Sequence, residues 1–296
     1  MKIVRIDQLR ERVLRLYESG LTSGDKTGWP ELDKHYTVAP GMLTILTGWP
    51  GSGKSEWLDA LMLNLACQGW RFAIFSPENL PHELHISKWL EKVTNKPFRS
   101  GPTERMSVDE VKEAIDEVAQ RFFFLDHKQD EPVSMHEILR DASVFFDDDF
   151  SDAKHGLIVD PWNELEHMRP AHMSMTEHVA QTLGMVRQWA RERRIHVWIV
   201  AHPQKLKRLD SNGKLPIPTP DTISDSQHWW NKADCCITVH RDLADPKNTD
   251  VDIHVQKMRF KHLGRPGMVT LHYDRLTGRY SQLAKQFSVV RDEDDE

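Results

Sequence analysis

The chain has 296 residues with a formal net charge of −6, and 39% of its residues are hydrophobic. This length favours one or two domains with a sizeable core, and the negative charge excludes a generally basic nucleic-acid-binding protein. No apolar run approaches the roughly 18 residues that span a membrane, so we expect no membrane partner. The three cysteines, two of them adjacent, argue against a disulfide framework and fit a reducing cytosol.

The first twenty residues carry an apolar stripe at helical spacing that includes Ile6, Val13 and Leu16. A helix this short is marginal alone, so we expect the stripe to dock on its own domain or on a neighbouring subunit. Arginines alternate here with acidic residues, which fits neither a signal peptide nor an acid-poor transit peptide. We therefore expect a cytoplasmic protein.

Residues 48–55 read Gly-Trp-Pro-Gly-Ser-Gly-Lys-Ser and fit the phosphate-loop pattern G-x-x-x-x-G-K-[ST]. An apolar strand over residues 42–47 precedes the motif, and helical spacing predicts a helix from about Lys54 to near Gly69. Backbone N–H groups would surround a phosphate, Lys54 would contact the β- and γ-phosphates, and Ser55 would hold Mg²⁺. The sequence therefore predicts a site for a nucleoside triphosphate, assigned to Gly48, Pro50, Gly51, Ser52, Gly53, Lys54 and Ser55.

A second apolar strand, residues 71–76, ends in Pro77-Glu78-Asn79. A carboxylate at the carboxyl end of a parallel strand, on the same edge as the phosphate loop, faces the ligand crevice. Glu78 is thus a candidate to orient or deprotonate the attacking water. The alternative is an acidic residue near the N-terminus of a helix that begins around Pro81.

The middle of the chain alternates helices with further strands. We expect helices over 108–120, 135–146 and 176–193, and a third strand over 122–125. The three aspartates 147–149 are interpreted as a solvated turn, and the segment with His167, His172 and His178 as a polar loop leading into a helix; no structural metal is expected.

Two more strands end in polar residues. The apolar run 155–160 closes on Asp160, the Walker B pattern, whose carboxylate would hold Mg²⁺ through a water or through Ser55. The fifth strand, 196–201, is followed by His202-Pro203-Gln204, where His202 or Gln204 could contact the γ-phosphate; a plain strand cap is the alternative.

The rest of the chain supplies a candidate polyanion site and a strand-rich end. The long polar segment 205–224 begins with Lys205, Lys207 and Arg208, the best local site for a nucleic-acid backbone. Strands are expected over 235–240, 251–257 and 268–273, added as antiparallel strands to the edge of a parallel sheet. The acidic end of the chain is expected to be a disordered tail.

These pieces occur in a known order. From about Gly28 to Tyr280 the chain resembles the RecA-like motor domain of DnaB-type replicative helicases, including the helicase half of Twinkle and of phage primase-helicases. The resemblance rests on Gly-Trp-Pro-Glu-Leu-Asp, the phosphate loop, Phe-Ser-Pro-Glu-Asn, Ile-Val-Asp-Pro-Trp-Asn-Glu-Leu, Val-Ala-His-Pro and Lys257-Met258-Arg259. It implies an α/β fold of the RecA-like P-loop NTPase class, divided into a linker helix (1–20), the motor domain (21–286) and the tail (287–296).

The resemblance also implies roles for particular residues. Glu78 matches the catalytic carboxylate and His202 the sensor position. Lys257 and Arg259 match the K-x-R pair that reaches the γ-phosphate of the adjacent subunit. Arg241 and Tyr273 match the pair that sandwiches the nucleotide base.

The function that the resemblance implies is an ATP- or dTTP-driven 5′-to-3′ DNA helicase that forms a hexameric ring on single-stranded DNA. Its expected setting is the cytoplasm of a prokaryote or a phage-infected cell, with primase and DNA polymerase as further partners. Two alternatives stay open: a RecA-type recombinase or loader that binds DNA without unwinding it, and a P-loop protein that does not use nucleic acid.

Overall fold

A mixed sheet forms the centre of the computed structural model, which describes residues 3–127, 131–149, 152–204, 216–223, 227–245 and 247–282. Within these residues the sheet has nine strands in the order β3-β2-β4-β5-β1-β6-β7-β8-β9. The strands are β1 (Leu43–Thr47), β2 (Trp70–Phe75), β3 (Phe122–Phe124), β4 (Lys154–Val159), β5 (His196–Val200), β6 (Cys235–His240), β7 (Asp250–Met258), β8 (Gly267–Tyr273) and β9 (Tyr280–Gln282).

The first six strands in chain order are parallel, and β7, β8 and β9 extend one edge of the sheet as antiparallel strands. The predicted α/β fold is therefore confirmed, and each expected strand agrees with the structure to within one or two residues. The short strand β9 was not expected. We call the edge at which β1, β2, β4 and β5 end the carboxyl edge, and the opposite edge the amino edge.

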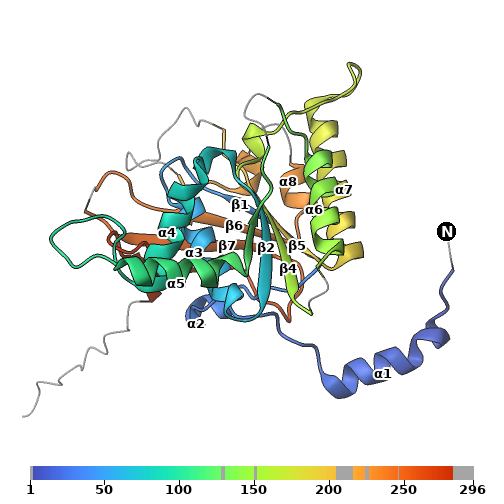
Figure 1. Cartoon of the computed structure of the whole chain (residues 1–296). Coiled ribbons are helices and arrows are strands. Elements are labelled where there is room, and N and C mark those ends of the chain that lie inside the picture. The colour runs from blue at the N-terminus through green and yellow to red at the C-terminus, as the bar shows by residue number, and fades with distance from the viewer. Residues whose placement is uncertain are drawn as a thin grey trace, which may run out of the picture.

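Helices cover both faces of the sheet (Figure 1). One face carries α3 (Lys54–Ala66), α4 (His82–Thr94) and α5 (Val108–Ala119); the other carries α6 (Met135–Asp147), α7 (Met175–Arg193) and α8 (His228–Lys232). The remaining short helices are α2 (Pro30–Asp33), η2 (Pro77–Asn79), η3 (Trp162–Glu164) and η4 (Pro220–Thr222). Because side chains alternate along a strand, neighbours such as Phe72 and Ala73 enter different cores.

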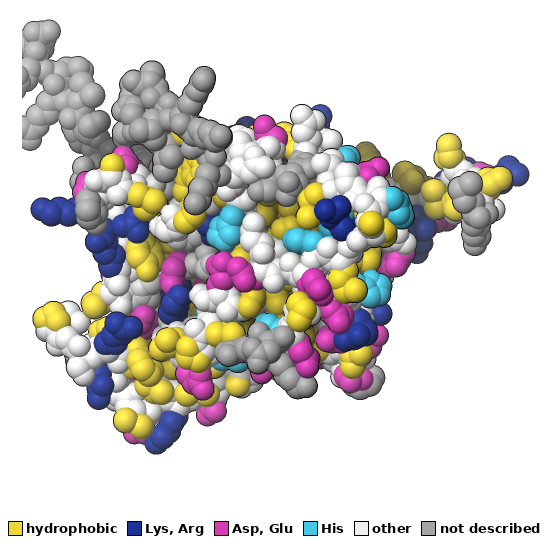
Figure 2. Space-filling view, turned by 90° about the horizontal axis from the view of Figure 1, so that it is seen from above, with side chains coloured by type: hydrophobic (Ala, Val, Ile, Leu, Met, Phe, Trp, Pro, Cys, Tyr) yellow, Lys and Arg dark blue, Asp and Glu magenta, His cyan; other side chains and the backbone are white. Residues whose placement is uncertain are grey.

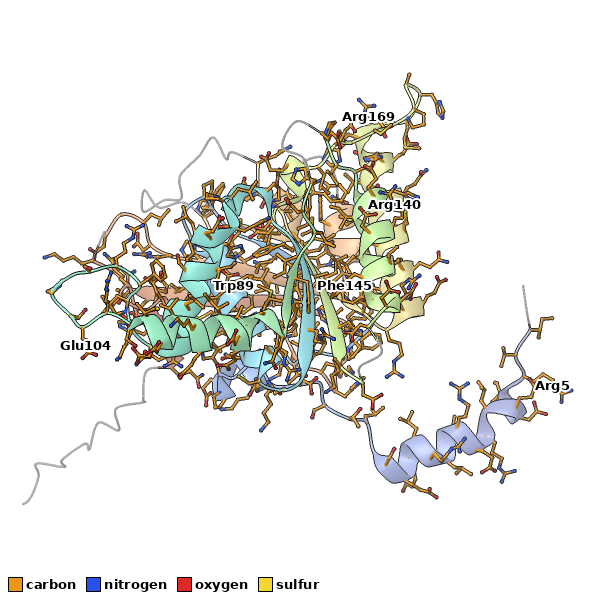
Figure 3. All side chains as sticks on the ribbon, viewed as in Figure 1. Arg5, Trp89, Glu104, Arg140, Phe145 and Arg169 are labelled. Atoms are coloured by element: carbon orange, nitrogen blue, oxygen red, sulfur yellow. The ribbon has the colours of Figure 1, made fainter. Side chains whose placement is uncertain are left out.

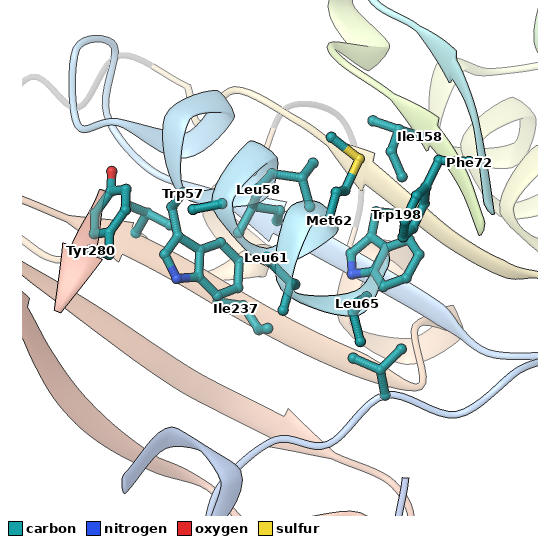
Figure 4. Packing of buried hydrophobic residues seen from close by; sticks show 14 of the residues in the cluster. Trp57, Leu58, Leu61, Met62, Leu65, Phe72, Ile158, Trp198, Ile237 and Tyr280 are labelled. Carbon is teal, nitrogen blue, oxygen red and sulfur yellow. The ribbon is translucent and has the colours of Figure 1, made fainter. Parts of the chain in front are cut away.

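Aromatic side chains fill the core under α3. Figure 4 shows Trp57, Leu61 and Leu65 along α3, with Trp198 and Phe72 beside the Leu65 end of the helix. Trp89 of α4 packs on Phe122 and Phe124 of β3, and Figure 3 places it between that helix and the sheet. This packing fixes the helix that the phosphate loop opens.

The Gly-Trp-Pro-Glu-Leu-Asp motif has a structural place in the same core. Trp29 is buried, stacks on Trp57 at 6.1 Å between ring centroids, and donates its indole N–H to the carbonyl of Tyr280 at 3.0 Å. The motif therefore ties the beginning of the domain to β9, behind the phosphate loop.

The N-terminal helix stands apart from this body. It comprises η1 (Ile6–Leu9) and α1 (Arg10–Ser19), contains no buried residue, and projects from the sheet and its helices in Figure 1. The expected helix is thus present, with its apolar stripe exposed. No helix among the described residues has the length and apolar character needed to cross a membrane.

The interpretation of residues 147–149 as a solvated turn is wrong for Asp149. Its side chain is only 6% exposed, forms an ion pair with Arg71, and lies 2.8 Å from Nε2 of His155. The partners come from β2 and β4, so the burial of this carboxylate depends on the sheet and not on the local acidic run. The histidine-rich segment is a loop leading into α7, as expected, with His167 between Trp162 and His178.

Candidate nucleotide-binding site

The phosphate loop joins β1 to α3 and therefore lies at the carboxyl edge. Gly53, the residue before α3, has a φ of 91°, a left-handed conformation that glycine adopts without strain. A Cβ atom on Gly48 would lie 2.3 Å from the carbonyl oxygen of Val239 on β6. These two glycines allow the loop to turn tightly against β6, where its N–H groups and the start of α3 favour an anion.

Lys54 is buried at the first residue of α3. Its ammonium donates to the carbonyl oxygens of Gly48 at 3.1 Å and Trp49 at 3.3 Å. Burial lowers the pKa of Lys54, and the nearby carboxyl groups of Asp160 and Glu78 oppose that shift. Among the described residues, the buried hydroxyl of Ser52 has no hydrogen-bond partner. A phosphate oxygen is the kind of acceptor that both groups could use.

Asp160 follows β4 and lies beside the start of α3. Burial raises the pKa of its carboxyl group to about 6, and a hydrogen bond with Ser55 opposes the rise. The Asp160 amide donates to the carbonyl of Phe75 at 2.9 Å, which aligns the ends of β4 and β2. The structure thus brings the two predicted metal ligands together. A hydroxyl and a buried carboxyl group are oxygen donors of the kind that Mg²⁺ accepts.

Glu78 and His202 face each other across the ends of β2 and β5. The distance between Nε2 of His202 and Oε1 of Glu78 is 3.6 Å. Burial lowers the pKa of His202, as does the charge of Lys54, while Glu78 opposes the shift. The backbone N–H of His202 donates to Oδ1 of Asn163 at 2.9 Å, which fixes this turn against the segment after β4.

The phosphate loop, Glu78 and His202 share one cavity of 580 Å³ at the carboxyl edge, and Asp160 lies beneath it beside Ser55. Figure 2 looks onto this edge and shows acidic, basic and histidine side chains mixed around its middle. The residues that line the cavity are Pro50, Gly51, Ser52, Gly53, Lys54, Ser55, Glu56, Glu78, Asn79, Lys88, His202, Arg241, Val251, Tyr273 and Tyr280.

Arg241 and Tyr273, the predicted base-binding pair, both line that cavity. The Arg241 guanidinium donates to the carbonyl of Asn248 through Nε at 3.2 Å and Nη2 at 2.8 Å. Burial raises the pKa of Tyr273 to about 12. Sequence reasoning missed Tyr280, whose ring centre lies 5.0 Å from that of Tyr273 and whose hydroxyl is 3.5 Å from the carbonyl of Gly53. Only the unexpected strand β9 brings Tyr280 here.

Lys88 is a second residue that the sequence did not reveal. Its ammonium lies 3.1 Å from Glu56 and 3.5 Å from Oδ1 of Asn79, the residue after Glu78. Glu56 also pairs with Lys92 at 2.6 Å, so α4 is held to the start of α3 by two ion pairs. The helical periodicity of α4 could not predict the ion pair of Lys88, because its partner Glu56 lies on α3.

Lys257 and Arg259 lie at the amino edge, away from the cavity. β7 runs antiparallel to β6, so Lys257 pairs with Cys236 near the start of β6. Cys236 in turn pairs with Ile45 in the middle of β1, and the Lys257 ammonium donates to the carbonyl of Ala233 before β6. The amide of Arg259 donates to the carbonyl of Asp234, beside the start of β1 and four residue steps of about 3.3 Å, roughly 13 Å, from its phosphate-loop end. Neither residue lines the nucleotide cavity of its own chain.

Lys205, Lys207 and Arg208 fall in residues 205–215, outside the described residues, as does the acidic tail 287–296. The described residues on either side of 205–215 meet each other. The amide of Gln204 donates to the carbonyl of Thr222 at 2.8 Å, and Pro203 forms a β-bridge with Ile223. The described residues Gln204 and Thr222 thus lie side by side at the carboxyl edge.

Comparison with known proteins identifies relatives of the chain. The family model for the DnaB-like helicase C terminal domain matches residues 24–282. The Twinkle homolog protein, chloroplastic/mitochondrial, of Arabidopsis thaliana is 39% identical over 266 residues, which cover 87% of this chain and 36% of the relative. The chain therefore spans about a third of the length of that relative.

Solved structures share the fold. The ATPase domain of G40P superposes with a TM-score of 0.79 at 18% identity, covering 96% of this chain and all of that one. A DnaB-like replicative helicase, studied with its primase interactions, gives 0.78 at 19% identity, covering 95% and 69% of the two chains. The RadB recombinase gives 0.54 at 15% identity, covering 88% and 99%.

The expectation of a prokaryotic or phage-infected cytoplasm is wrong, because the curated relative is a chloroplastic or mitochondrial protein of a plant. The reason is physical. The expectation was based on motifs whose residues form the phosphate loop or pack on the sheet. Neither requirement depends on the compartment in which the domain works.

Proposed function

Because the chain belongs to the family of the DnaB-like helicase C terminal domain, we propose that it is the motor of a replicative DNA helicase. In this proposal, hydrolysis of ATP, dTTP or another nucleoside triphosphate at interfaces between copies drives translocation on single-stranded DNA. A hexameric ring and 5′-to-3′ polarity are part of the proposal, as is primase as a partner, since one solved helicase of the same fold interacts with primase. A polymerase contact through residues 287–296 is proposed from their acidic sequence alone.

The phosphate loop would bind the triphosphate. The N–H groups of Gly48, Gly51, Ser52 and Gly53, with Pro50 shaping the turn, would surround the β-phosphate, and the ammonium of Lys54 would leave its two carbonyl partners for phosphate oxygens. Ser55 and Asp160 would hold Mg²⁺, which supplies charge neutralisation on the transferring phosphoryl group. Arg241 and Tyr273 would stack on the base, with Tyr280 beside them.

Glu78 and His202 would act on the far side of the γ-phosphate. Glu78 is partly exposed in the cavity and lies opposite Lys54, a position from which a carboxylate can orient and deprotonate a water. His202 contacts Glu78 on one side and leads directly into residues 203–215 on the other, so its contact with the γ-phosphate would be transmitted to that basic segment.

The observation that carries the assembly is the position of Lys257 and Arg259. Neither cation lines the cavity of its own chain, and the side chains of both are held near the amino edge by the carbonyl of Ala233. In this proposal a second copy supplies them, and a head-to-tail contact of this kind generates a ring or a helical filament. An arginine finger supplied in this way is worth about 10³–10⁵ in rate.

Single-stranded DNA would follow the basic segment that contains Lys205, Lys207 and Arg208. A recombinase-like filament is the second candidate, since it would also place Arg259 at a neighbour's site. The TM-score with RadB is 0.54, lower than the 0.79 and 0.78 with the two helicase domains, and this difference favours the ring.

The test is ATP hydrolysis as a function of protein concentration, with and without single-stranded DNA. A rate per subunit that rises steeply with concentration and is stimulated by DNA supports a shared active site in a DNA motor. A rate per subunit that is constant and indifferent to DNA would sink the proposal. Filaments in electron micrographs without unwinding of a forked duplex would favour the recombinase.

A further inference from the structure

A single buried carboxylate at the amino edge organises three arginines. The side chain of Asp234, the residue before β6, is fully buried. Its Oδ1 lies 3.0 Å from Nε of Arg259, 3.2 Å from Nη2 of Arg191 and 3.3 Å from Nε of Arg187. Its Oδ2 accepts the backbone N–H of Leu43 at 3.2 Å, so the carboxylate is fixed to the start of β1.

The Arg259 guanidinium is held along one side only. Besides the contact of Nε with Asp234, its Nη2 donates to the carbonyls of Asn231 at 3.3 Å and Ala233 at 3.4 Å. Its Nη1 donates to none of the described residues, and 31% of the side chain is exposed. The ammonium of Lys257 donates to the same Ala233 carbonyl at 2.9 Å. Residues 231–234 therefore align both cations with part of Arg259 left open.

We propose that Asp234 is a positioning residue that orders Arg259 before it meets the nucleotide of a neighbouring copy; this rests on the proposed function. A free arginine side chain has many rotamers, and ordering it at the moment of reaction would cost entropy that a pre-formed contact avoids. Three guanidinium groups share one carboxylate, so the cluster keeps excess positive charge for a phosphate. Asp234 orients the finger without neutralising it.

The test uses the full-length chain with Asp234→Asn, which keeps the shape of the side chain and removes its charge. We expect kcat for ATP hydrolysis to fall tenfold or more, while KM stays within about twofold, because the finger acts on the transition state of the neighbour's site. The nucleotide site of the variant itself is intact.

Mixing two variants distinguishes loss of Arg259 positioning from damage to the fold. Lys54→Ala has a dead site but an ordered finger, so it should restore hydrolysis at the sites of Asp234→Asn subunits when the two are mixed. Random mixing makes this pairing at about a quarter of the interfaces in a ring. Arg191→Gln is the matched control: it removes another guanidinium from the same carboxylate and should keep kcat near the wild-type value.

Two further variants keep every outcome informative. Arg259→Ala mixed with Lys54→Ala tests the proposed shared site, and absence of restoration there would overturn the proposed function. If that mixture is active, two results would overturn the positioning role of Asp234. One is a wild-type kcat in the Asp234→Asn variant, and the other is a failure of Lys54→Ala to restore hydrolysis when it is mixed with Asp234→Asn. Should Asp234→Asn misfold, Arg259→Lys replaces it, because one ammonium cannot hold Asp234 and a phosphate together; wild-type kcat in that variant would overturn the proposal.

Discussion

The indole N–H of Trp49 in the phosphate loop donates a hydrogen bond of 2.8 Å to the carbonyl of Pro216. The carbonyl of Trp49 itself accepts from the Lys54 ammonium, so one buried residue connects Lys54 to the described segment that begins at Pro216. That segment is fastened elsewhere too, since the carbonyl of Pro218 accepts from Thr238 at 2.8 Å. A conformational change of the phosphate loop would therefore act through Trp49 on Pro216, in a segment that is also hydrogen-bonded to β6 at Pro218.

Trp49→Phe should uncouple the nucleotide site from DNA. Phenylalanine keeps an aromatic ring and removes the donor, at a cost of about 1 kcal/mol for one hydrogen bond, so the ratio of DNA-stimulated to unstimulated hydrolysis should fall about fivefold. Trp189→Phe is the matched control, because it removes an indole donor that bonds Ser143 at 2.9 Å between α6 and α7. An unchanged stimulation ratio in Trp49→Phe would contradict the coupling.

Asp149→Asn should destabilise the domain, although it lies in an acidic run. Its carboxylate is 6% exposed and pairs with Arg71, whose side chain is 23% exposed, and with His155, so the substitution removes a buried negative charge from between two partners. We expect a loss of about 3 kcal/mol in the free energy of unfolding, as for other broken buried pairs. Asp148→Asn, at the exposed neighbour, is the control and should change it by less than about 0.5 kcal/mol. Equal urea midpoints for the two variants would refute this.

A buried histidine should make stability depend on pH. His196 is fully buried between Thr44 and the carbonyl of Ala39, and burial lowers its pKa to about 3 from an ordinary 6.5. A depressed histidine pKa contributes stability that is present above pH 6.5 and is lost progressively as the pH falls toward 3. At pH 5 the loss from this group should be about 2 kcal/mol.

The measurement compares urea unfolding of the wild type and His196→Gln at pH 8 and pH 5. Other groups titrate equally in both proteins, so the difference between their two pH-dependent changes isolates His196. Parallel changes in the two proteins would show that this ring is not the titrating group.

The candidate site residues at the carboxyl edge could be predicted because each lies in a short sequence motif. The phosphate loop, Glu78, Asp160 and His202 each directly follow an apolar strand, and parallel strands bring their ends to one edge. The structure adds only their mutual arrangement, such as the 3.6 Å between Glu78 and His202.

The residues that were missed depend on tertiary contacts. Tyr280 enters the cavity through β9, a three-residue strand too short to leave a pattern. Asp234 looks from sequence like any acid before a strand, and its three arginines come from α7 and from the end of β7. Asp149 was misjudged for the same reason, since its partners lie on β2 and β4. Contacts between distant segments have no period that a local sequence pattern could reveal.

The last prediction concerns the exposed helix. Val13 and Leu16 of α1 are 57% and 50% exposed, and Ile6 is 88% exposed, so none of the residues that the structure describes covers this apolar stripe. We propose that a neighbouring copy covers it, so Val13→Asp should weaken assembly and shift the steep rise of hydrolysis to higher protein concentration. The thermal midpoint of the unassembled chain should move by less than about 2 °C, because the residue contributes nothing to the core. Arg15→Asp, on the opposite side of α1, is the control and should assemble as the wild type does. Sedimentation at matched concentrations decides it: if Val13→Asp assembles as the wild type does, the stripe is not the subunit contact.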